Sequence, residues 1–266
     1  MNASEKFLAE ATAESRPAIT ARVVVVLAHP DDETIGCGAL LARLQDVSIV
    51  HVTDGAPRNG ADAARHGFDS PAEYAAARRE ELQAAAALAG IGPDGLICFG
   101  VADQEVVHNL AEVARRLLPV LEGAEIVLTH AYEGGHPDHD ATAFAVHAAA
   151  ALIGPDAPAI IEMPLYRATP DGSWLRQEFA AGPTPIVLRL TEIEWARKEA
   201  MLAAHGTQAG TLAPFGAADE AFRPAPAWDF TKPPNDARVL YESYEWGIDF
   251  SGFAERVRAA GAELGL

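Results

Sequence analysis

Short runs of β-branched and other apolar residues alternate with stretches of helical pattern along the first 165 residues. The run at 23–27 has no polar alternation, which is typical of a buried strand in a parallel sheet. We expect strands at 23–27, 47–53, 96–99, 125–129 and 159–163. Helices are expected within 38–44, 70–90, 105–121 and 137–153. This alternation favours an α/β three-layer sandwich with a mostly parallel central sheet. The carboxyl ends of its strands would then share one edge, where open sheets bind ligands.

The last third of the chain is less regular. Residues 186–190 are expected to form a strand and 192–204 a helix. Residues 206–236 are rich in Gly, Pro and Ala, and this composition predicts a long loop or lid that covers another part of the protein. A length of 266 residues fits one α/β domain better than two equal ones. We therefore expect a single domain over residues 1–266, with a core at about 20–165 and an irregular C-terminal elaboration at about 166–266.

The formal net charge of −18 argues against a phosphate-coated partner such as nucleic acid. The two cysteines, Cys37 and Cys98, form no C-x-x-C pair, so a reducing cytoplasm is the simpler expectation. The first 20 residues lack the apolar core of a signal peptide, and no run is long and uncharged enough for a membrane span. The sequence leaves homo-oligomerisation open.

A dense group of titratable residues follows the first predicted strand. His29, Asp31, Asp32 and Glu33 occupy five positions at the expected ligand-binding edge. Carboxylates this close raise one another's pKa values unless a cation compensates them. Imidazole and carboxylate are normal ligands of Zn²⁺. Helix capping would explain one of the acids, but neither a second acid nor His29.

A nucleotide-binding loop is the alternative for this segment. Gly36 and Gly38 follow the strand and Asp54 ends the next one, but Leu41 stands where the third glycine of G-x-G-x-x-G belongs. Three carboxylates would also face a pyrophosphate with the wrong charge. We therefore prefer a metal site.

A second group follows the fourth predicted strand. His136 and His139 flank Pro137 and Asp138 at an expected helix start, and Asp138 and Asp140 are close enough to orient an imidazole. A surface helix that happens to carry two histidines would explain this segment alone. Both groups follow strands of one sheet, however, so they should converge. His29, Asp32 and His139 would then form a two-histidine, one-carboxylate zinc site with a position open for water.

The two motifs together resemble the PIG-L/LmbE-like zinc de-N-acetylases, which include N-acetylglucosaminylphosphatidylinositol deacetylase, diacetylchitobiose deacetylase and the mycothiol and bacillithiol pathway deacetylases. The resemblance rests on A-H-P-D-D-E at 28–33 and H-P-D-H at 136–139, and it covers roughly residues 20–152. It extends to G-x-G at 36–38, R-x-x-E at 78–81 with Ala89-Gly90, G-x-x-D at 100–103 and H-G-T-Q at 205–208. The chain departs from the family at Ala56, where a Glu is common, and at Gly134, where some members carry a tyrosine.

The resemblance implies a Rossmann-like fold, with zinc held by His29, Asp32 and His139 and with Asp31 as the general base. It implies that His136 steadies the oxyanion or protonates the leaving amine, and we expect Asp138 to keep His136 protonated. Arg58 is a candidate for holding a substrate hydroxyl or phosphate, and Trp174 and Trp228 are candidates for stacking on a sugar ring.

Three functions remain open from the sequence. The first is a zinc-dependent hydrolase that removes an acetyl group from an N-acetylated amino sugar or glycoconjugate. The second is an amidase acting on a sugar–thiol conjugate, and the third is a non-catalytic metal- or sugar-binding module.

Overall fold

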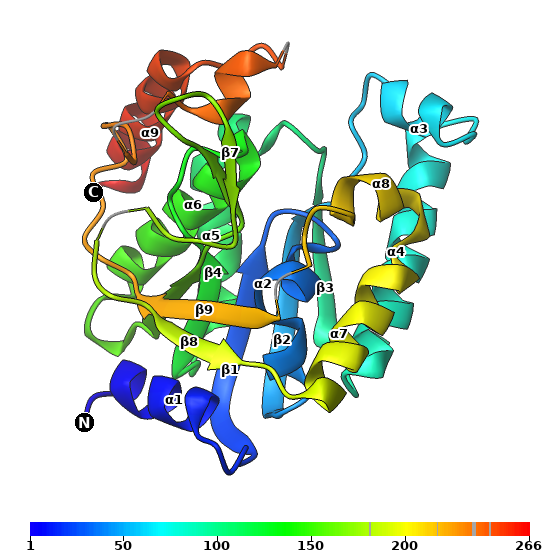
Figure 1. The fold of residues 1–266 in the computed structure, drawn as a ribbon. Helices are drawn as coiled ribbons and strands as arrows, with labels where there is room; N and C mark the ends of the chain where they lie inside the picture. Colours follow the sequence, from blue (N-terminus) through cyan, green and yellow to red (C-terminus); the bar gives the residue numbers. More distant parts are fainter. Residues whose placement is uncertain (181, 217, 236–237, 245) are drawn as a thin grey trace.

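The computed structural model describes residues 1–180, 182–216, 218–235, 238–244 and 246–266. A seven-stranded sheet in the order β3-β2-β1-β4-β5-β9-β8 forms its centre (Figure 1). The strands are β1 (Ile19–Leu27), β2 (Leu44–Thr53), β3 (Leu96–Val101), β4 (Ile126–His130), β5 (Ala159–Met163), β8 (Ile186–Arg189) and β9 (Asp219–Pro224). The first five strands pair in parallel, and β9 and β8 are added antiparallel. This confirms the expected α/β sandwich and each predicted strand.

Alternate residues of β1 divide the core into two layers. Val24 and Val26 face a cluster that includes α5 (Leu110–Leu121), α6 (Pro137–Ile153) and α9 (Phe250–Leu264). Val23 and Val25 face the other cluster, formed with α1 (Ala3–Thr12), α2 (Asp32–Leu41), α4 (Pro71–Leu88) and α7 (Glu192–Ala204). All four valines are buried because helices cover both faces of the sheet.

Successive strands are first added on one side of β1 and then on its other side. From β1 the sheet grows through β2 to β3 on one side and through β4 to β5 on the other. The carboxyl ends of β1 and β4 therefore lie next to each other at the topological switch point, which is where open α/β sheets bind ligands. The two polar motifs follow these two strands.

The C-terminal third is more ordered than the sequence predicted. The expectation of a loop or lid over 206–236 is wrong for β9, which inserts between β5 and β8 in the central sheet. Residues 217 and 236 lie outside the described ones. The short α8 (Ala209–Leu212) and the hairpin of β6 (Tyr166–Ala168) and β7 (Trp174–Arg176) lie beside the switch point instead.

Helix α2 begins at Asp32, six residues before the predicted helix, and bends at Cys37. The backbone N–H groups of Ala39 and Leu40, just past the bend, donate to the carboxylate of Glu220 on β9 at 2.8 and 3.1 Å. Helices α1 and α9 were not predicted, and neither were the short α3 (Ala61–Arg65) and α8. None of the helices in the described part of the chain combines the length and apolar character needed to cross a bilayer.

Candidate metal centre and substrate cavity

A cavity of about 670 Å³ opens at the carboxyl ends of β1 and β4. One end of it carries the polar residues of both motifs, and the other end carries aromatic side chains. The residues that line the cavity include His29, Asp31, Asp32, Arg78, Asp103, Gln104, His136, His139, Tyr166, Trp174, Arg176, Tyr244 and Trp246.

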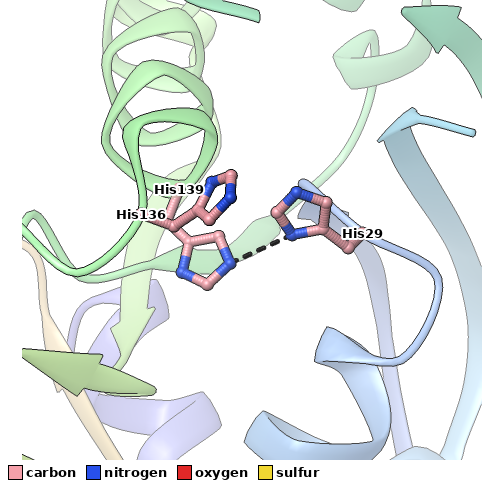
Figure 2. A group of neighbouring side chains, drawn as sticks. All are labelled: His29, His136 and His139. Atoms are coloured by element: carbon pink, nitrogen blue, oxygen red, sulfur yellow. Dashed lines mark hydrogen bonds between the residues drawn. The ribbon is translucent and has the colours of Figure 1, made fainter. Parts of the chain in front are cut away.

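The three predicted metal ligands converge at the polar end. His29 Nδ1 lies 3.1 Å from His139 Nε2 and 3.3 Å from an Asp32 carboxylate oxygen, and His139 Nε2 lies 3.4 Å from the other oxygen of Asp32. Figure 2 shows His29 facing His136 and His139, which come from the start of α6. A tetrahedral ion with bonds of about 2.0–2.1 Å places its ligand atoms roughly 3.3–3.4 Å apart. The spacings are therefore close to those around one such ion, with His29 and His139 each facing a different oxygen of Asp32. Among the described residues, the groups that could share one ion include His29 with His136 and His139, and Asp32 with His130 and His139.

The charges around these ligands also suit a cation. Burial lowers the pKa of His29, but Asp103, Asp138 and Asp32 outweigh burial and raise it well above the usual value. Burial likewise opposes ionisation of Asp32, but His139, His130 and His29 hold its pKa well below the usual range. The cluster thus stabilises positive charge at its centre, which is what a divalent ion supplies.

Asp31 lies next to the predicted ligand Asp32 and also lines the cavity. Its Oδ2 accepts a 2.9 Å hydrogen bond from Nη2 of Arg78, which also donates to the carbonyls of Pro30 and Gly55. Burial raises the pKa of Asp31, and the Arg78 charge opposes that rise. The carboxylate is therefore oriented and carries the raised pKa that suits a general base.

Arg78 depends on a glycine in the loop after β2. Gly55 has φ of +70°, and a Cβ there would overlap the Arg78 guanidinium. The sequence pattern placed Arg78 in the family's helix but gave it no role in the site. Its burial and its contact with Asp31 are visible only in the fold.

His136 lies in the cavity wall, with its ring centroid 4.6 Å from that of His29. Its Nδ1 accepts a 3.1 Å hydrogen bond from the backbone N–H of Asp138, so a neutral ring carries its proton on Nε2. Burial, followed by the charge of His29, lowers the pKa of His136 well below the usual value. The expectation that Asp138 keeps His136 protonated is therefore wrong.

The Asp138 carboxylate instead accepts from the backbone N–H groups of Gln104 and Val106, and it lies 3.4 Å from Nε2 of His29. Asp103 lies 3.2 Å from the same nitrogen. Two acids thus orient the imidazole of His29 through its second nitrogen, as is usual for metal-binding histidines. The family pattern contained Asp103, but no sequence signal linked it to His29.

Of the other sequence candidates, Trp174 lies at the cavity, whereas Arg58, Trp228 and Tyr132 lie outside its lining. Arg58 does not line the cavity, and its half-exposed guanidinium pairs with Asp54 at 2.7 Å. Trp174 lines the cavity, whereas the indole of Trp228 donates to Glu162 in the core. The Tyr132 hydroxyl donates to the carbonyl of Lys232 and is buried away from the site.

The hairpin β6–β7 supplies two of the aromatic side chains at the other end of the cavity. The Tyr166 ring lies 5.3 Å from the ring of His139 and stacks on Trp174 at 5.4 Å. Tyr244 and Trp246 form a second stacked pair, and Trp246 contacts the ring of His136 at 4.6 Å. These four residues, named here the aromatic wall, reach from the metal centre along the cavity.

Buried Glu133 attaches the hairpin to the metal centre. Its carboxylate accepts from the backbone N–H groups of Leu165 and Tyr166 at 2.7 and 3.0 Å. Gly135 lies against the Tyr166 carbonyl so closely that a Cβ would overlap it. The loop that leads into His136 and the start of the hairpin are therefore fixed relative to each other.

The chain is similar to proteins that are named as deacetylases. Residues 24–150 match the family model PIG-L, described as GlcNAc-PI de-N-acetylase. Over 142 residues the chain is 32% identical to a 1D-myo-inositol 2-acetamido-2-deoxy-alpha-D-glucopyranoside deacetylase of Mycobacterium sp. (strain KMS), covering 44% of this chain and 46% of the relative. The chain thus spans about half the length of that relative.

A Bacillus subtilis (strain 168) protein named as a probable N-acetyl-alpha-D-glucosaminyl L-malate deacetylase 2 is 28% identical over 70% of this chain and 82% of its own length. The fold is similar to that of the A40926 pseudoaglycone deacetylase Dbv21, with a TM-score of 0.57 and 23% identity over 77% of this chain and 97% of that one. The matched family region, residues 24–150, contains both polar motifs of the candidate metal centre.

Proposed function

We propose that this chain is a zinc-dependent de-N-acetylase that hydrolyses the acetamide of an N-acetylated amino sugar or glycoconjugate. The observation that supports it most is the convergence of His29, Asp32 and His139 at ligand spacing, with Asp31 beside them in a cavity. The names of the relatives support the substrate class, because those proteins are described as deacetylases of N-acetylglucosamine conjugates.

His29, Asp32 and His139 would hold the ion. When bound there, zinc lowers the pKa of water and polarises a carbonyl oxygen. Asp31, oriented by Arg78, accepts the proton of the attacking water. The Nε2–H of His136 donates to the oxygen of the acetamide as negative charge develops on it. Asp31 then returns a proton to the leaving amine, and acetate and the free amino sugar are released.

Both cysteines have free thiols, which supports a reducing compartment such as the cytoplasm as the place of this reaction.

The test combines metal analysis with an amine-release assay. The purified protein should contain about one zinc per chain and should release equal amounts of acetate and free amine from N-acetylglucosamine glycosides. A chelator should stop the reaction, and added zinc should restore it. Retention of zinc without amine release from any N-acetylated sugar or sugar–thiol conjugate would contradict the proposal and leave a non-catalytic binding module.

A further inference from the structure

Arg176 on β7 is one of the two arginines among the described residues that line the cavity. Among the described residues no carboxylate lies within ion-pair distance of its guanidinium, and its buried Nε has no hydrogen-bond partner. The other lining arginine, Arg78, is occupied by Asp31 and two carbonyls. In a chain of net charge −18, an unpaired arginine inside a cavity is a site for an anion.

The hairpin holds Arg176 toward the metal centre. In the register of β6 and β7, Arg176 lies directly opposite Tyr166, and Trp174 lies opposite Ala168. Residues opposite each other in an antiparallel pair point to the same face with Cβ atoms about 5 Å apart. Tyr166 in turn contacts His139. An anion bound by Arg176 would thus lie close enough to the metal centre to belong to the same small substrate.

The guanidinium is also positioned by an aromatic ring. Its central carbon lies 5.3 Å from the centroid of the Trp174 ring, so the indole supports the cation while the hydrogen-bond donors remain available. An arginine fork of this kind binds carboxylate or phosphate with two parallel hydrogen bonds.

We propose that Arg176 forms a subsite for an anionic substituent of the substrate, a carboxylate or a phosphate. This inference rests on the proposed function, and the subsite makes the enzyme selective for acidic amino-sugar conjugates.

The test compares neutral and anionic probes. The neutral probe is the methyl glycoside of N-acetylglucosamine, and the anionic probes are its carboxymethyl glycoside, N-acetylglucosamine 1-phosphate and N-succinylglucosamine. The first two anionic probes carry the negative charge on the sugar, and the third carries it on the acyl group. The anionic probe with the highest kcat/KM therefore identifies where the anion of the substrate is attached. Wild-type kcat/KM should be at least tenfold higher for one anionic probe than for the neutral one.

Arg176→Met should lower kcat/KM for the preferred anionic probe about 10- to 100-fold, because a charge-assisted hydrogen-bonded pair is lost. The kcat/KM for the neutral probe should change by less than about threefold. Arg176→Lys should recover part of the loss. The matched control is Arg167→Met, which removes a charge from the opposite face of the same hairpin, where Arg167 pairs with Leu175. It should leave the preference unchanged.

A binding measurement separates this proposal from the proposed function. Glucosamine 1-phosphate, the carboxymethyl glycoside of glucosamine and succinate are products that need no turnover. Calorimetry should show that the product of the preferred probe binds more tightly to wild type than to Arg176→Met. Equal hydrolysis of all probes, or equal loss on neutral and anionic probes in Arg176→Met, would overturn the anion subsite and leave the deacetylase intact. Arg176-dependent binding without hydrolysis of any probe would support the subsite and contradict the deacetylase.

Discussion

At the scale of single residues, Asp31 and Asp32 are neighbours in sequence with opposite surroundings. Asp32 faces three imidazoles that lower its pKa, whereas Asp31 faces one guanidinium that only partly offsets the effect of burial. Two adjacent carboxylates that differ in this way suit different roles, one as a ligand and one as a proton acceptor.

Replacing the proton acceptor should separate catalysis from metal binding. Asp31→Asn keeps the shape of the side chain but removes the base, so kcat/KM should fall by about 10²- to 10⁴-fold while the zinc content stays near one per chain. Amine release and elemental analysis of the same preparation measure both. Loss of zinc together with activity would make Asp31 a ligand or a structural acid.

Asp32→Asn should give the complementary result. The substitution removes the charge that His29 and His139 share, so zinc content and activity should fall together. Arg58→Met is a suitable control, since Arg58 lies outside the cavity, and it should keep both near wild type. Full zinc content in Asp32→Asn would show that another set of side chains holds the ion.

At the scale of elements, the strands and the helices between them were predictable because burial leaves a strong pattern. Residues 23–26 are valines that point alternately to the two faces of the sheet and are all buried. Helices α4 and α6 each begin with a proline, which is a common first residue of a helix. The convergence of His29, Asp32 and His139 followed from chain topology alone. The contacts of Arg78 with Asp31 and of Asp103 with His29 could not be predicted, because they join elements far apart in sequence.

Among the elements that the sequence analysis missed, α1 and β9 were missed for different reasons. Helix α1 carries a capping box formed by Asn2 and Glu5, a signal that the sequence does contain. Strand β9 lies in a Gly-, Pro- and Ala-rich segment, and only its pairing with β5 and β8 defines it as a strand. Local composition therefore favoured a loop, and the tertiary pairing overrode it.

Helix α6 should make stability depend on pH. Burial against Phe230 lowers the pKa of His147 to about 4 from an unfolded value near 6.5. Between these values the unfolded chain binds a proton that the folded chain does not, so the free energy of unfolding should fall as the pH decreases from about 6.5 to 4. The loss should be of the order of 1–3 kcal/mol, since one pKa unit is about 1.4 kcal/mol.

Urea unfolding of wild type and His147→Gln at several pH values measures this contribution. The difference in unfolding free energy between the two proteins should be constant above about pH 7 and should change below it. A difference that is the same at pH 5 and pH 7.5 would show that the imidazole titrates alike in both states.

At the scale of the whole molecule, a buried ion pair connects the C-terminal third to the metal-binding half. Nζ of Lys198 on α7 lies 2.8 Å from the Glu220 carboxylate on β9 and donates to the Ile35 carbonyl of α2. The same carboxylate accepts two backbone N–H groups of α2. Elements from three parts of the chain therefore meet at two side chains.

Removing one partner of this pair should be costly. Glu220→Ala leaves the Lys198 charge and two N–H groups buried without their acceptor, so the free energy of unfolding should fall by about 3–5 kcal/mol. Thermal unfolding should show a correspondingly lower Tm. The double variant Glu220→Ala with Lys198→Met should recover part of the loss, and no recovery would show that the ion pair is not the cause.

The tie between Glu133 and the hairpin also has a consequence for redesign. Since the metal-binding motifs come from the first 140 residues and the opposite wall of the cavity from residues after 164, recognition could be changed by transplanting the hairpin from a relative. The transplanted segment must meet two conditions where it joins the rest of the protein. It must donate two backbone N–H groups to the Glu133 carboxylate, and it must leave room beside Gly135. Donor hairpins that meet both conditions would change substrate selectivity without disturbing the residues of the candidate metal centre.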